Sequence, residues 1–371
     1  MYYRDTYAKI DLDAIAHNIH VIQSNTNKKL IAVMKANGYG HSDFYVAKTA
    51  MKAGCSMVAV SSLDEALALR RQGFYSQILI LGHIRPSDVE TAIEHQITIP
   101  VVSMDWLIQV VELNPDLNHL LFHIKIDTGM NRVGIKHIHE VKGAIKTIEE
   151  HNGIVEGIFT HYASADEEDK TMCDEQFSKF KEIVLNCNYD FKWIHCENSA
   201  AILSYEDDLT NIARLGLAMY GVSPVPGNFD LIPALSLKSH LVRVEEVKQG
   251  ETVGYGATYI ADEDCIIGTL PIGYADGFLR ANQGRYLYCQ GEWCEVVGRV
   301  CMDQCMIKLP KMFKVGTAVE IISINNPVTK MAKELNTIPY EVLCLLSDRI
   351  PRKILKNKQQ IAVVNKRLRE F

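Results

Sequence analysis

The chain has 371 residues, of which 47% are hydrophobic and 23% are charged, and its formal net charge is −6 at pH 7. This length suits one large domain with a smaller one, and the acidic balance disfavours binding to nucleic acid or to an anionic membrane, which requires concentrated Lys and Arg. The N-terminus lacks the apolar segment of a signal peptide and no run reaches the about 18 apolar residues of a membrane span, so we expect a cytoplasmic protein.

Short runs of β-branched residues alternate with amphipathic segments through the first two thirds of the chain. The runs predict strands near residues 30–35, 56–61, 77–82, 97–102, 120–127, 155–161, 191–196 and 211–215. The segments between them predict helices over 41–54, 63–73, 86–95, 104–113, 136–151, 170–187 and 198–204. This alternation is typical of a TIM-type (β/α)8 barrel. An open doubly wound sheet is the main alternative, which the strand count and the lack of a G-x-G-x-x-G motif after the first strand disfavour.

A turn-rich segment that contains Pro224, Pro226, Gly227 and Pro233 interrupts this pattern. We therefore predict a barrel domain over residues 1–230 and a second domain over residues 231–371. Beyond the boundary, short apolar runs predict strands over 235–247, 265–270, 285–290, 292–300, 304–309 and 318–324, with one helix over 327–336. The predicted architecture is an α/β barrel followed by a mostly β C-terminal domain.

A lysine stands at the carboxyl end of the first barrel strand. Lys35 follows the apolar run of residues 30–34 and precedes a stretch of small and aromatic residues, 36–41. The carboxyl ends of the strands are where an α/β barrel carries its chemistry, and a primary amine there suits a Schiff base with an aldehyde such as pyridoxal phosphate, PLP. Taken alone this signal is modest, because most lysines at strand ends are solvated.

Further polar groups follow the other predicted strands at the same rim of the barrel. They are Lys125 and Arg132 after the fifth strand, His161 after the sixth, Ser199 after the seventh, and Arg214, Gly216 and Leu217 at the eighth. Cations inside a barrel are costly unless they are paired with anions, with a cofactor or with each other. Backbone N–H groups at Ser199 and Gly216 could bind a phosphate, and Tyr39 could add a hydroxyl. Together these groups predict an anion-binding catalytic site.

Metal-binding patterns and the basic C-terminus give weaker signals. Cys301 and Cys305 are separated by three residues, no C-x-x-C pair occurs, and His137 and His139 at i, i+2 would point to different faces of a helix. We therefore expect no metal site, and ten cysteines that remain reduced thiols. The basic residues between 349 and 369 are interpreted as a solvated face.

The segments that carry the predicted site residues resemble the alanine racemase family. Residues 32–41, AVMKANGYGH, are similar to the PLP-attachment motif of that family. Further similar segments are KIDTGMNR at 125–132, NSAA at 198–201, RLG at 214–216, GYGATY at 254–259, IGYADG at 272–277, GRVCMDQ at 298–304 and NTIPYEV at 336–342. The segments occur in order over nearly the whole chain, so the resemblance is highly specific.

The resemblance implies a PLP-dependent enzyme of fold type III that interconverts L-alanine and D-alanine as a homodimer with shared active sites. Lys35 would attach the cofactor, and Tyr255, supplied by the partner subunit, would be the second acid/base. Racemisation needs a group on each face of the α-carbon that removes or returns the proton. The D-alanine would serve cell-wall synthesis or another route, which the sequence leaves open.

The same resemblance implies roles for the other site residues. Arg214 would face the pyridine nitrogen, His161 would lie near the cofactor and Arg214, and Arg132 and Met302 would bind the substrate carboxylate. The residues around the phosphate would be Tyr39, Ser199, Gly216, Leu217 and Tyr340, and those at the entrance would be Tyr274, Arg280 and Arg299. Lys125 would carry an N-carbamate, which turns a cation into an anion able to pair with Arg132.

Three features depart from the usual pattern of the family. Gly38 stands where alanine is commoner, and Glu197 stands where a neutral residue is usual. A carboxylate near the phosphate would weaken cofactor affinity unless Glu197 faces away. The segment 347–352 is a variant of the usual ending, and we expect it to touch no proposed chemistry.

Other members of the PLP-dependent barrel proteins offer alternatives. A serine or broader small-amino-acid racemase is the nearest, although the serine enzymes tend to carry asparagine where Tyr340 stands and a membrane domain ahead of the barrel. A fold-type III decarboxylase would use an acidic partner at the pyridine nitrogen in place of Arg214. A PLP-homeostasis barrel without turnover would lack the β domain and Tyr255. Alanine is therefore the preferred substrate.

Overall fold

A computed structural model describes residues 2–114 and 116–368 of the chain. It contains two compact units. The first, here called the β unit, comprises the chain up to Ala14, Tyr39–Ser42 and the chain from Pro233 onward; the second, the barrel unit, comprises Ile15–Gly38 and Asp43–Ile232. Each unit is described by itself.

The barrel unit is built on parallel strands. One sheet has the order β4 (Ile78–Ile80), β3 (Met57–Val60), β2 (Lys29–Val33) and β9 (Ile212–Leu215), and the other has the order β5 (Ile99–Val101), β6 (Leu121–Lys125), β7 (Ile154–Phe159) and β8 (Trp193–His195). A parallel bridge from Leu79 to Thr98 joins β4 to β5. The bonds from Asn211 N–H to the Ile194 carbonyl and from Arg214 N–H to the Glu197 carbonyl, both 3.1 Å, join the ends of β8 and β9. The sheets therefore close into the expected TIM-type barrel.

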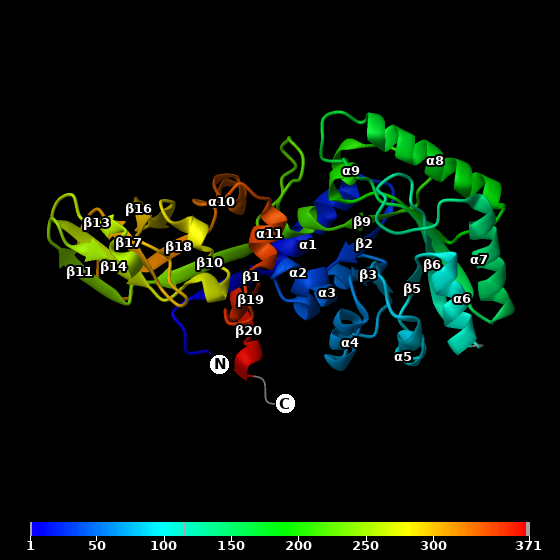
Figure 1. The fold of residues 1–371 in the computed structure, drawn as a ribbon, viewed down its shortest axis with the longest axis horizontal. Helices are drawn as coiled ribbons and strands as arrows, with labels where there is room; N and C mark the ends of the chain where they lie inside the picture. The colour runs from blue at the N-terminus through cyan, green and yellow to red at the C-terminus, as the bar shows by residue number, and fades with distance from the viewer. Residues whose placement is uncertain (1, 115, 369–371) are drawn as a thin grey trace. The chain divides into compact units, whose positions relative to one another are not determined.

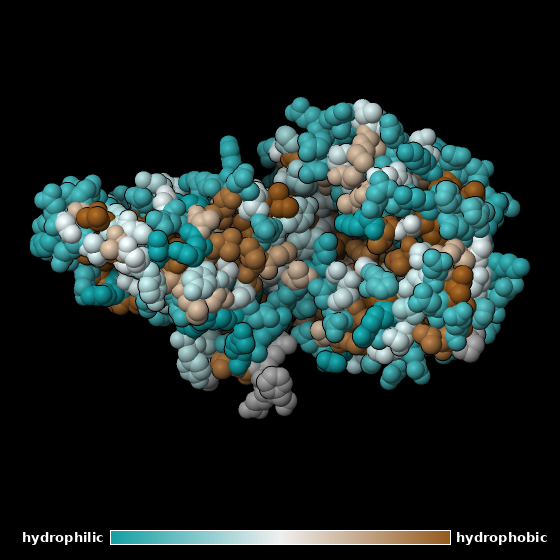
Figure 2. All heavy atoms as spheres, viewed as in Figure 1, coloured by the Kyte–Doolittle hydropathy of each residue, from teal (hydrophilic) through white to brown (hydrophobic). Residues whose placement is uncertain are grey.

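Helices lie on the outside of these strands (Figure 1). They are α3 (Asp43–Lys52), α4 (Leu63–Arg71), α5 (Val89–Glu94), α6 (Met104–Leu113), α7 (Ile138–Glu150), α8 (Thr171–Cys187) and α9 (Ser199–Ser204), and α1 (Leu12–Ser24) precedes β2. The Ser103 and Asn198 side chains begin α6 and α9 by accepting the N–H of Trp106 and Ala201. Hydrophilic residues predominate on the visible outer surface (Figure 2), as amphipathic helices require. The strands themselves are buried on both faces, which explains their nearly continuous apolar sequences.

The β unit is dominated by one ten-stranded sheet, with the order β11-β14-β17-β16-β15-β18-β10-β1-β19-β20. Its strands are β1 (Tyr7–Asp11), β10 (Leu235–His240), β11 (Arg243–Val247), β14 (Cys265–Leu270), β15 (Tyr286–Cys289), β16 (Glu292–Val297), β17 (Cys305–Leu309), β18 (Ala318–Ile322), β19 (Arg352–Lys356) and β20 (Gln359–Val364). A short hairpin, β12 (Thr252–Val253) and β13 (Tyr259–Ile260), and the helices α10 (Val328–Glu334) and α11 (Pro339–Cys344) complete the unit. The mostly β character of this region is confirmed.

The N-terminus differs from the sequence-based division at 230/231. Residues 7–11 form β1, which pairs antiparallel with β10 and parallel with β19, so residues 2–14 belong to the β unit. The basic C-terminal segment is also not one solvated face. Arg352 is buried at the start of β19, where its guanidinium donates to the carbonyl oxygens of Gly40, Leu346, Ser347 and Ile350.

Two searches of the described residues bear on ligands and membranes. Between residues 2 and 368, leaving out 115, no helix has both the length and the hydropathy that crossing a bilayer demands. Over the same residues, no group of three or more His, Cys, Asp and Glu side chains is arranged to hold a metal ion.

Candidate functional site

Lys35 lies directly beyond β2, at the start of an unusual backbone turn. The next three residues, Ala36, Asn37 and Gly38, all have left-handed conformations, with φ of 53°, 56° and 62°. This conformation costs about 1–2 kcal/mol for each residue other than glycine. The Glu65 carboxylate holds the turn, since Oε1 accepts the Ala36 N–H at 2.6 Å while Oε2 accepts the Ser61 N–H beyond β3 at 2.7 Å. The site lysine is therefore anchored to the neighbouring strand.

Arg214 lies at the carboxyl end of β9 and is buried among protein acceptors. Its Nη1 donates to Nδ1 of His195 at 2.7 Å, and its Nη2 lies 2.7 Å from the Cys196 carbonyl, 2.9 Å from the Thr160 carbonyl and 2.9 Å from Nδ1 of His161. Burial lowers the pKa of Arg214 to about 10, so the guanidinium remains a cation at neutral pH. Its Nε–H donates to no acceptor among the described residues. The Nε–H of a buried cation therefore remains for a ligand.

Lys125, at the end of β6, is a buried amine in a cationic environment. Its Nζ donates to the Ile126 carbonyl at 3.2 Å and lies 5.0 Å from the centre of the Phe159 ring. Burial, followed by the charges of Arg214 and Arg132, lowers the pKa of Lys125 well below its usual value. The surroundings of this amine therefore favour its neutral form more than those of an exposed lysine do.

His161 and Arg132 complete the polar groups on this rim. Burial and then Arg214 lower the pKa of His161 well below its ordinary value, so this imidazole is neutral. Arg132 is exposed in the loop that follows β6, which the Asp127 carboxylate fixes by accepting the N–H groups of Gly129 and Asn131 at 3.1 and 3.0 Å. The structure thus brings Lys125, His161 and Arg214 together, as the sequence predicts.

The backbone near Ser199 forms a small cradle. The N–H groups of Gly216 and Ala218 both point at Oγ of Ser199, at 2.9 and 3.3 Å. Leu217 lies between them and is buried. Two N–H groups that converge on one oxygen are arranged as an oxyanion would require. The cradle joins the start of α9 to the end of β9, where the sequence predicts phosphate binding.

Glu197 faces away from this cradle. Its Oε2 lies 3.0 Å from Nζ of Lys28, which also binds Asp207 at 2.7 Å, and Thr210 donates to the same Glu197 oxygen at 3.4 Å. Burial raises the pKa of Glu197, an effect that Lys28 opposes. The carboxylate is thus committed to a structural ion pair, which answers the concern that it would repel a phosphate.

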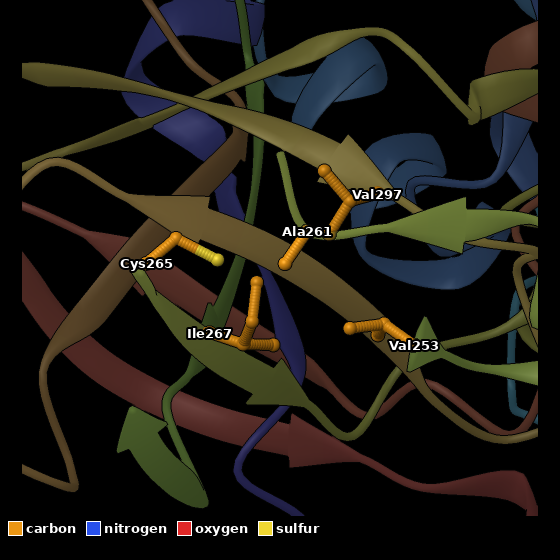
Figure 3. Packing of buried hydrophobic residues seen from close by; sticks show 5 residues of the cluster. All are labelled: Val253, Ala261, Cys265, Ile267 and Val297. Carbon is orange, nitrogen blue, oxygen red and sulfur yellow. The ribbon is translucent and has the colours of Figure 1, made fainter. Parts of the chain in front are cut away.

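Tyr255 lies on the hairpin of the β unit, between β12 and β13. Its side chain is 69% exposed. The hairpin is fixed by an apolar cluster of Val253, Ala261, Cys265, Ile267 and Val297 (Figure 3). Gly256 has φ of 70°, and a Cβ there would come within 2.8 Å of Nη1 of Arg299, so Arg299 packs against the Tyr255 turn. The exposed phenol is therefore accessible to another molecule.

Tyr274 and Met302 are held side by side in the β unit. The Tyr274 N–H donates to the Cys301 carbonyl at 3.0 Å, and the Ala275 N–H donates to the Met302 carbonyl at 3.1 Å. Gly273 permits this approach, because a Cβ there would lie 2.4 Å from the Met302 carbonyl oxygen. Both side chains are exposed.

The segment 347–352 contacts the sequence neighbours of the predicted site residues Tyr274 and Met302. Arg349 binds Asp303, the neighbour of Met302, at 2.6 Å, and its Nε lies 3.6 Å from buried Asp276. Arg4 donates two bonds to Asp276, of 2.6 and 2.9 Å. Sequence reasoning missed this network because its members are scattered along the chain.

The remaining predicted residues also lie in the β unit. The rings of Tyr39 and Tyr340 are 5.8 Å apart, and Tyr340 is in the first turn of α11. Gly40 has φ of 78° and lies so close to Leu343 that a Cβ would come within 2.4 Å of its carbonyl oxygen. Arg280 is exposed at the start of a 3₁₀ turn, Arg280–Asn282.

Sequence analysis also missed residues that contact the predicted ones. Glu65 holds the Lys35 turn, and His195 and His123 extend inward from Arg214. A signal was present, because His123 and Lys125 are two residues apart on one strand and therefore share a face. The capping pattern S-x-x-E at 62–65 similarly marked Glu65.

The chain is similar to known proteins over nearly its whole length. Family models described as the alanine racemase N-terminal domain and C-terminal domain match residues 10–224 and 234–354. A curated alanine racemase of Anoxybacillus flavithermus is 44% identical over 378 residues, which cover 98% of both chains. A crystal structure of alanine racemase from Bacillus anthracis with bound L-Ala-P is similar with a TM-score of 0.93, at 37% identity and 98% coverage of both chains. A histidine racemase from Leuconostoc mesenteroides is similar with a TM-score of 0.90, at 30% identity, covering 96% of this chain and 99% of that one.

Proposed function

Because the chain belongs to the alanine racemase family, we propose that it is an alanine racemase, which interconverts L-alanine and D-alanine with PLP as its cofactor. The observation that carries the proposal is the placement of Lys35 beyond β2 with Arg214, His161 and Lys125 on the same rim of a closed barrel. Similarity over nearly the full length supports it.

The residues present fit PLP. Arg214 retains an Nε–H for the pyridine nitrogen, and Lys35 supplies the amine for attachment. The cradle of Ser199, Gly216 and Ala218, with Leu217 between the last two, suits a phosphate. We propose that Tyr39 and Tyr340 contribute to phosphate binding as well, as the family resemblance implies. When bound, PLP would withdraw electrons from the amino acid and make its α-hydrogen acidic.

Two groups of this chain would move the α-proton. The Lys35 amine would remove or return it on one face, and the Tyr255 hydroxyl would do so on the other. Arg132 and the Met302 backbone would bind the carboxylate of the substrate, and Tyr274, Arg280 and Arg299 would line the entrance, where positive charge favours an anion. His161 would help to orient Arg214, to which it is bonded at 2.9 Å.

Arg214 would limit side reactions. A guanidinium only donates hydrogen bonds, so Arg214 would hold the pyridine nitrogen of bound PLP unprotonated and would limit how strongly the cofactor withdraws electrons. The proton would then return to the α-carbon of the substrate quickly, and transamination would be limited.

We also propose that Lys125 carries an N-carbamate. Carbamate formation joins a neutral amine to CO₂ with loss of one proton, and burial beside two arginines favours the neutral amine. The product is an anion, which would relieve the cationic crowding made by Arg132 and Arg214.

The enzyme would act as a homodimer in which the partner subunit's Tyr255 completes each site. The 69% exposure of Tyr255, on a hairpin held by an apolar cluster, supports this arrangement, because the phenol is available to a second copy of the chain. The cytoplasmic localisation and the use of D-alanine in the cell wall remain predictions.

Alanine is the preferred substrate, with serine or another small amino acid as the alternative. The similar histidine racemase shows that the fold also accommodates another amino acid. A pocket separates a methyl from a hydroxymethyl group by only about 100-fold unless a clash is built in, so weak serine turnover is expected.

The experiment is to incubate the PLP-loaded protein with L-alanine, L-serine or L-histidine and to separate the enantiomers chromatographically. Racemisation of L-alanine at the highest kcat/KM supports the proposal. A preference for serine or histidine would contradict the substrate assignment, and no racemisation of any of them would contradict the activity.

A further inference from the structure

A continuous line of hydrogen bonds leads from Arg214 into the barrel and out at its other end. Nη1 of Arg214 bonds Nδ1 of His195 at 2.7 Å, and Nε2 of His195 bonds Nδ1 of His123 at 2.9 Å. Nε2 of His123 then bonds Oε2 of Glu156 at 3.3 Å. Glu156 is the third residue of β7, whereas Arg214 lies near the carboxyl end of β9. The line of hydrogen bonds therefore crosses the barrel interior.

The two ends of this line dictate the direction of every bond in it. A guanidinium can only donate, so Nδ1 of His195 must accept and the His195 proton must reside on Nε2. Nε2–H of His195 therefore donates to Nδ1 of His123, and the His123 proton resides on Nε2, facing Glu156. An ionised carboxylate can only accept, which agrees with this end of the line. Both imidazoles are consequently neutral Nε2–H tautomers.

Electrostatics agree with neutral rings. Burial lowers the pKa of His123, against the opposing influence of Glu156, and burial together with Arg214 lowers the pKa of His195 far below its usual value. Glu156 is the opposite case, because its hydrogen bonds outweigh burial and lower its pKa to about 2. The carboxylate is therefore ionised at neutral pH.

The backbone is shaped to admit this line. The pairing of β6 with β7 shifts between Phe122 and His123, so that Glu156 is an extra residue in β7. Such bulges re-aim a side chain. Gly157 then leaves room for the imidazole, because a Cβ there would lie 2.8 Å from Nδ1 of His123.

Other contacts fix His195 and Glu156 in this line. The Phe159 ring stacks on His195, with centroids 4.7 Å apart and planes at 8°. Lys192, whose side chain is 60% exposed, binds Oε1 of Glu156 at 2.7 Å, and the Gln77 amide binds Oε2. The carboxylate is thus held from outside the barrel as well as from within.

We propose that Glu156 is a positioning residue for Arg214, acting through His123 and His195 as one hydrogen-bonded chain of fixed direction. The consequence for catalysis rests on the proposed function. The line of hydrogen bonds would keep the Arg214 guanidinium donating toward the pyridine nitrogen and would so suppress transamination during racemisation. The tautomers of the two histidines, in contrast, follow from the contacts alone.

The first measurement is therefore independent of catalysis. The PLP-loaded wild-type protein is labelled with ¹⁵N in its histidine rings, and the spectra of His123→Gln and His195→Gln identify the two residues. The proposed line of hydrogen bonds requires a protonated Nε2 and an unprotonated Nδ1 in both histidine rings from pH 6 to pH 9. A protonated Nδ1 in either ring, or titration to the imidazolium in this range, would overturn the proposal.

The second measurement uses Glu156→Gln, which keeps the shape but removes the charge. Its matched control is Glu149→Gln, which removes an exposed carboxylate of α7 that takes no part in this line of hydrogen bonds. A charge-assisted hydrogen bond exceeds a neutral one in strength, so we expect Glu156→Gln to raise pyruvate release per racemisation about 3- to 10-fold. Glu149→Gln should leave this ratio at the wild-type value.

The outcomes separate the inference from the function on which it rests. Wild-type protein that racemises no amino acid contradicts the proposed function. The histidine tautomers, measured by NMR, would still test the line of hydrogen bonds. Active protein in which Glu156→Gln has the same product ratio as Glu149→Gln overturns the positioning role. If Glu156→Gln does not fold, Lys192→Met removes an exposed partner of the same carboxylate; it should shift the ratio in the same direction by a smaller factor, and an unchanged ratio overturns the role.

Discussion

Nη1 of Arg214 lies 2.7 Å from Nδ1 of His195, so a cation at the mouth of the barrel is bonded to a neutral ring inside it. Because the cation can only donate, this contact determines which nitrogen of His195 carries the proton. His195 is fully buried, so it contacts Arg214 from inside the barrel.

Lys35→Ala should abolish racemisation and remove the absorbance of the attached cofactor, because no other amine would occupy this position beyond β2. The circular dichroism spectrum should be unchanged, since Lys35 is exposed. Lys48→Ala, on the outer helix α3, serves as the control and should retain both properties. A borohydride-reducible PLP adduct on Lys35→Ala would identify a different lysine.

Arg214→Glu should lower racemisation and raise transamination. A carboxyl group can share a proton with the pyridine nitrogen, whereas the guanidinium cannot, so the ring would withdraw electrons more strongly. Pyruvate release per racemisation measures the partition. Arg214→Lys, which keeps the charge, should change the partition less, and an unchanged ratio in Arg214→Glu would remove Arg214 from this role.

Mixed dimers test whether the sites are shared. Lys35→Ala and Tyr255→Ala homodimers should both be nearly inactive, whereas each heterodimer would contain one site with both defects and one with neither. Random assembly makes about half of the dimers heterodimers, so co-expression should restore about a quarter of the sites. Mutants mixed after folding, without subunit exchange, provide the control. Verified heterodimers that remain inactive would show that Tyr255 serves its own subunit or is not the second base.

The Lys125 carbamate can be tested by depleting CO₂. Protein kept in CO₂-free buffer at mildly acidic pH should lose racemase activity, because protonation drives the carbamate back to amine and CO₂. Bicarbonate at pH 8 should restore it, and ¹³C-bicarbonate should give a carbamate signal that Lys125→Ala lacks. Activity that is indifferent to CO₂, together with no ¹³C signal in the active protein, would rule out the modification.

Glu156 should contribute to acid stability. Its pKa is lowered to about 2 in the folded protein, so its stabilisation is present above the ordinary carboxyl value near 4.5 and is lost as the pH falls from there toward 2. We expect Glu156→Gln to lower the free energy of unfolding by about 1–3 kcal/mol at pH 7 and by much less at pH 3. Urea unfolding at both pH values measures this; an equal loss at both would indicate a packing defect.

Much of the barrel was predictable from local pattern. The eight predicted runs coincide with β2 through β9 within a few residues, because strands buried on both faces carry continuous apolar sequences. Lys35, Lys125 and Arg214 were predictable from the same pattern, because each lies at or near the end of such a run and the ends of the strands meet at one rim.

Other features depend on partners far along the chain. The strand β1 joins β10 and β19, more than 200 residues away, and its own short sequence does not reveal that choice. The direction of Glu197 was decided by Lys28, and the burial of Arg352 by the carbonyl groups around it.

The sequence by itself therefore determined the order of the elements, the ends of the strands and the identities of the polar groups placed there, because these follow from periodicity and residue chemistry along a local segment. Only the tertiary structure decided which of those groups touch. The bulge at Glu156 and the space beside Gly157 align Arg214, His195 and His123 into one chain, and such an alignment depends on the register between neighbouring strands. Register is set by the packing of the whole barrel, which no single segment encodes.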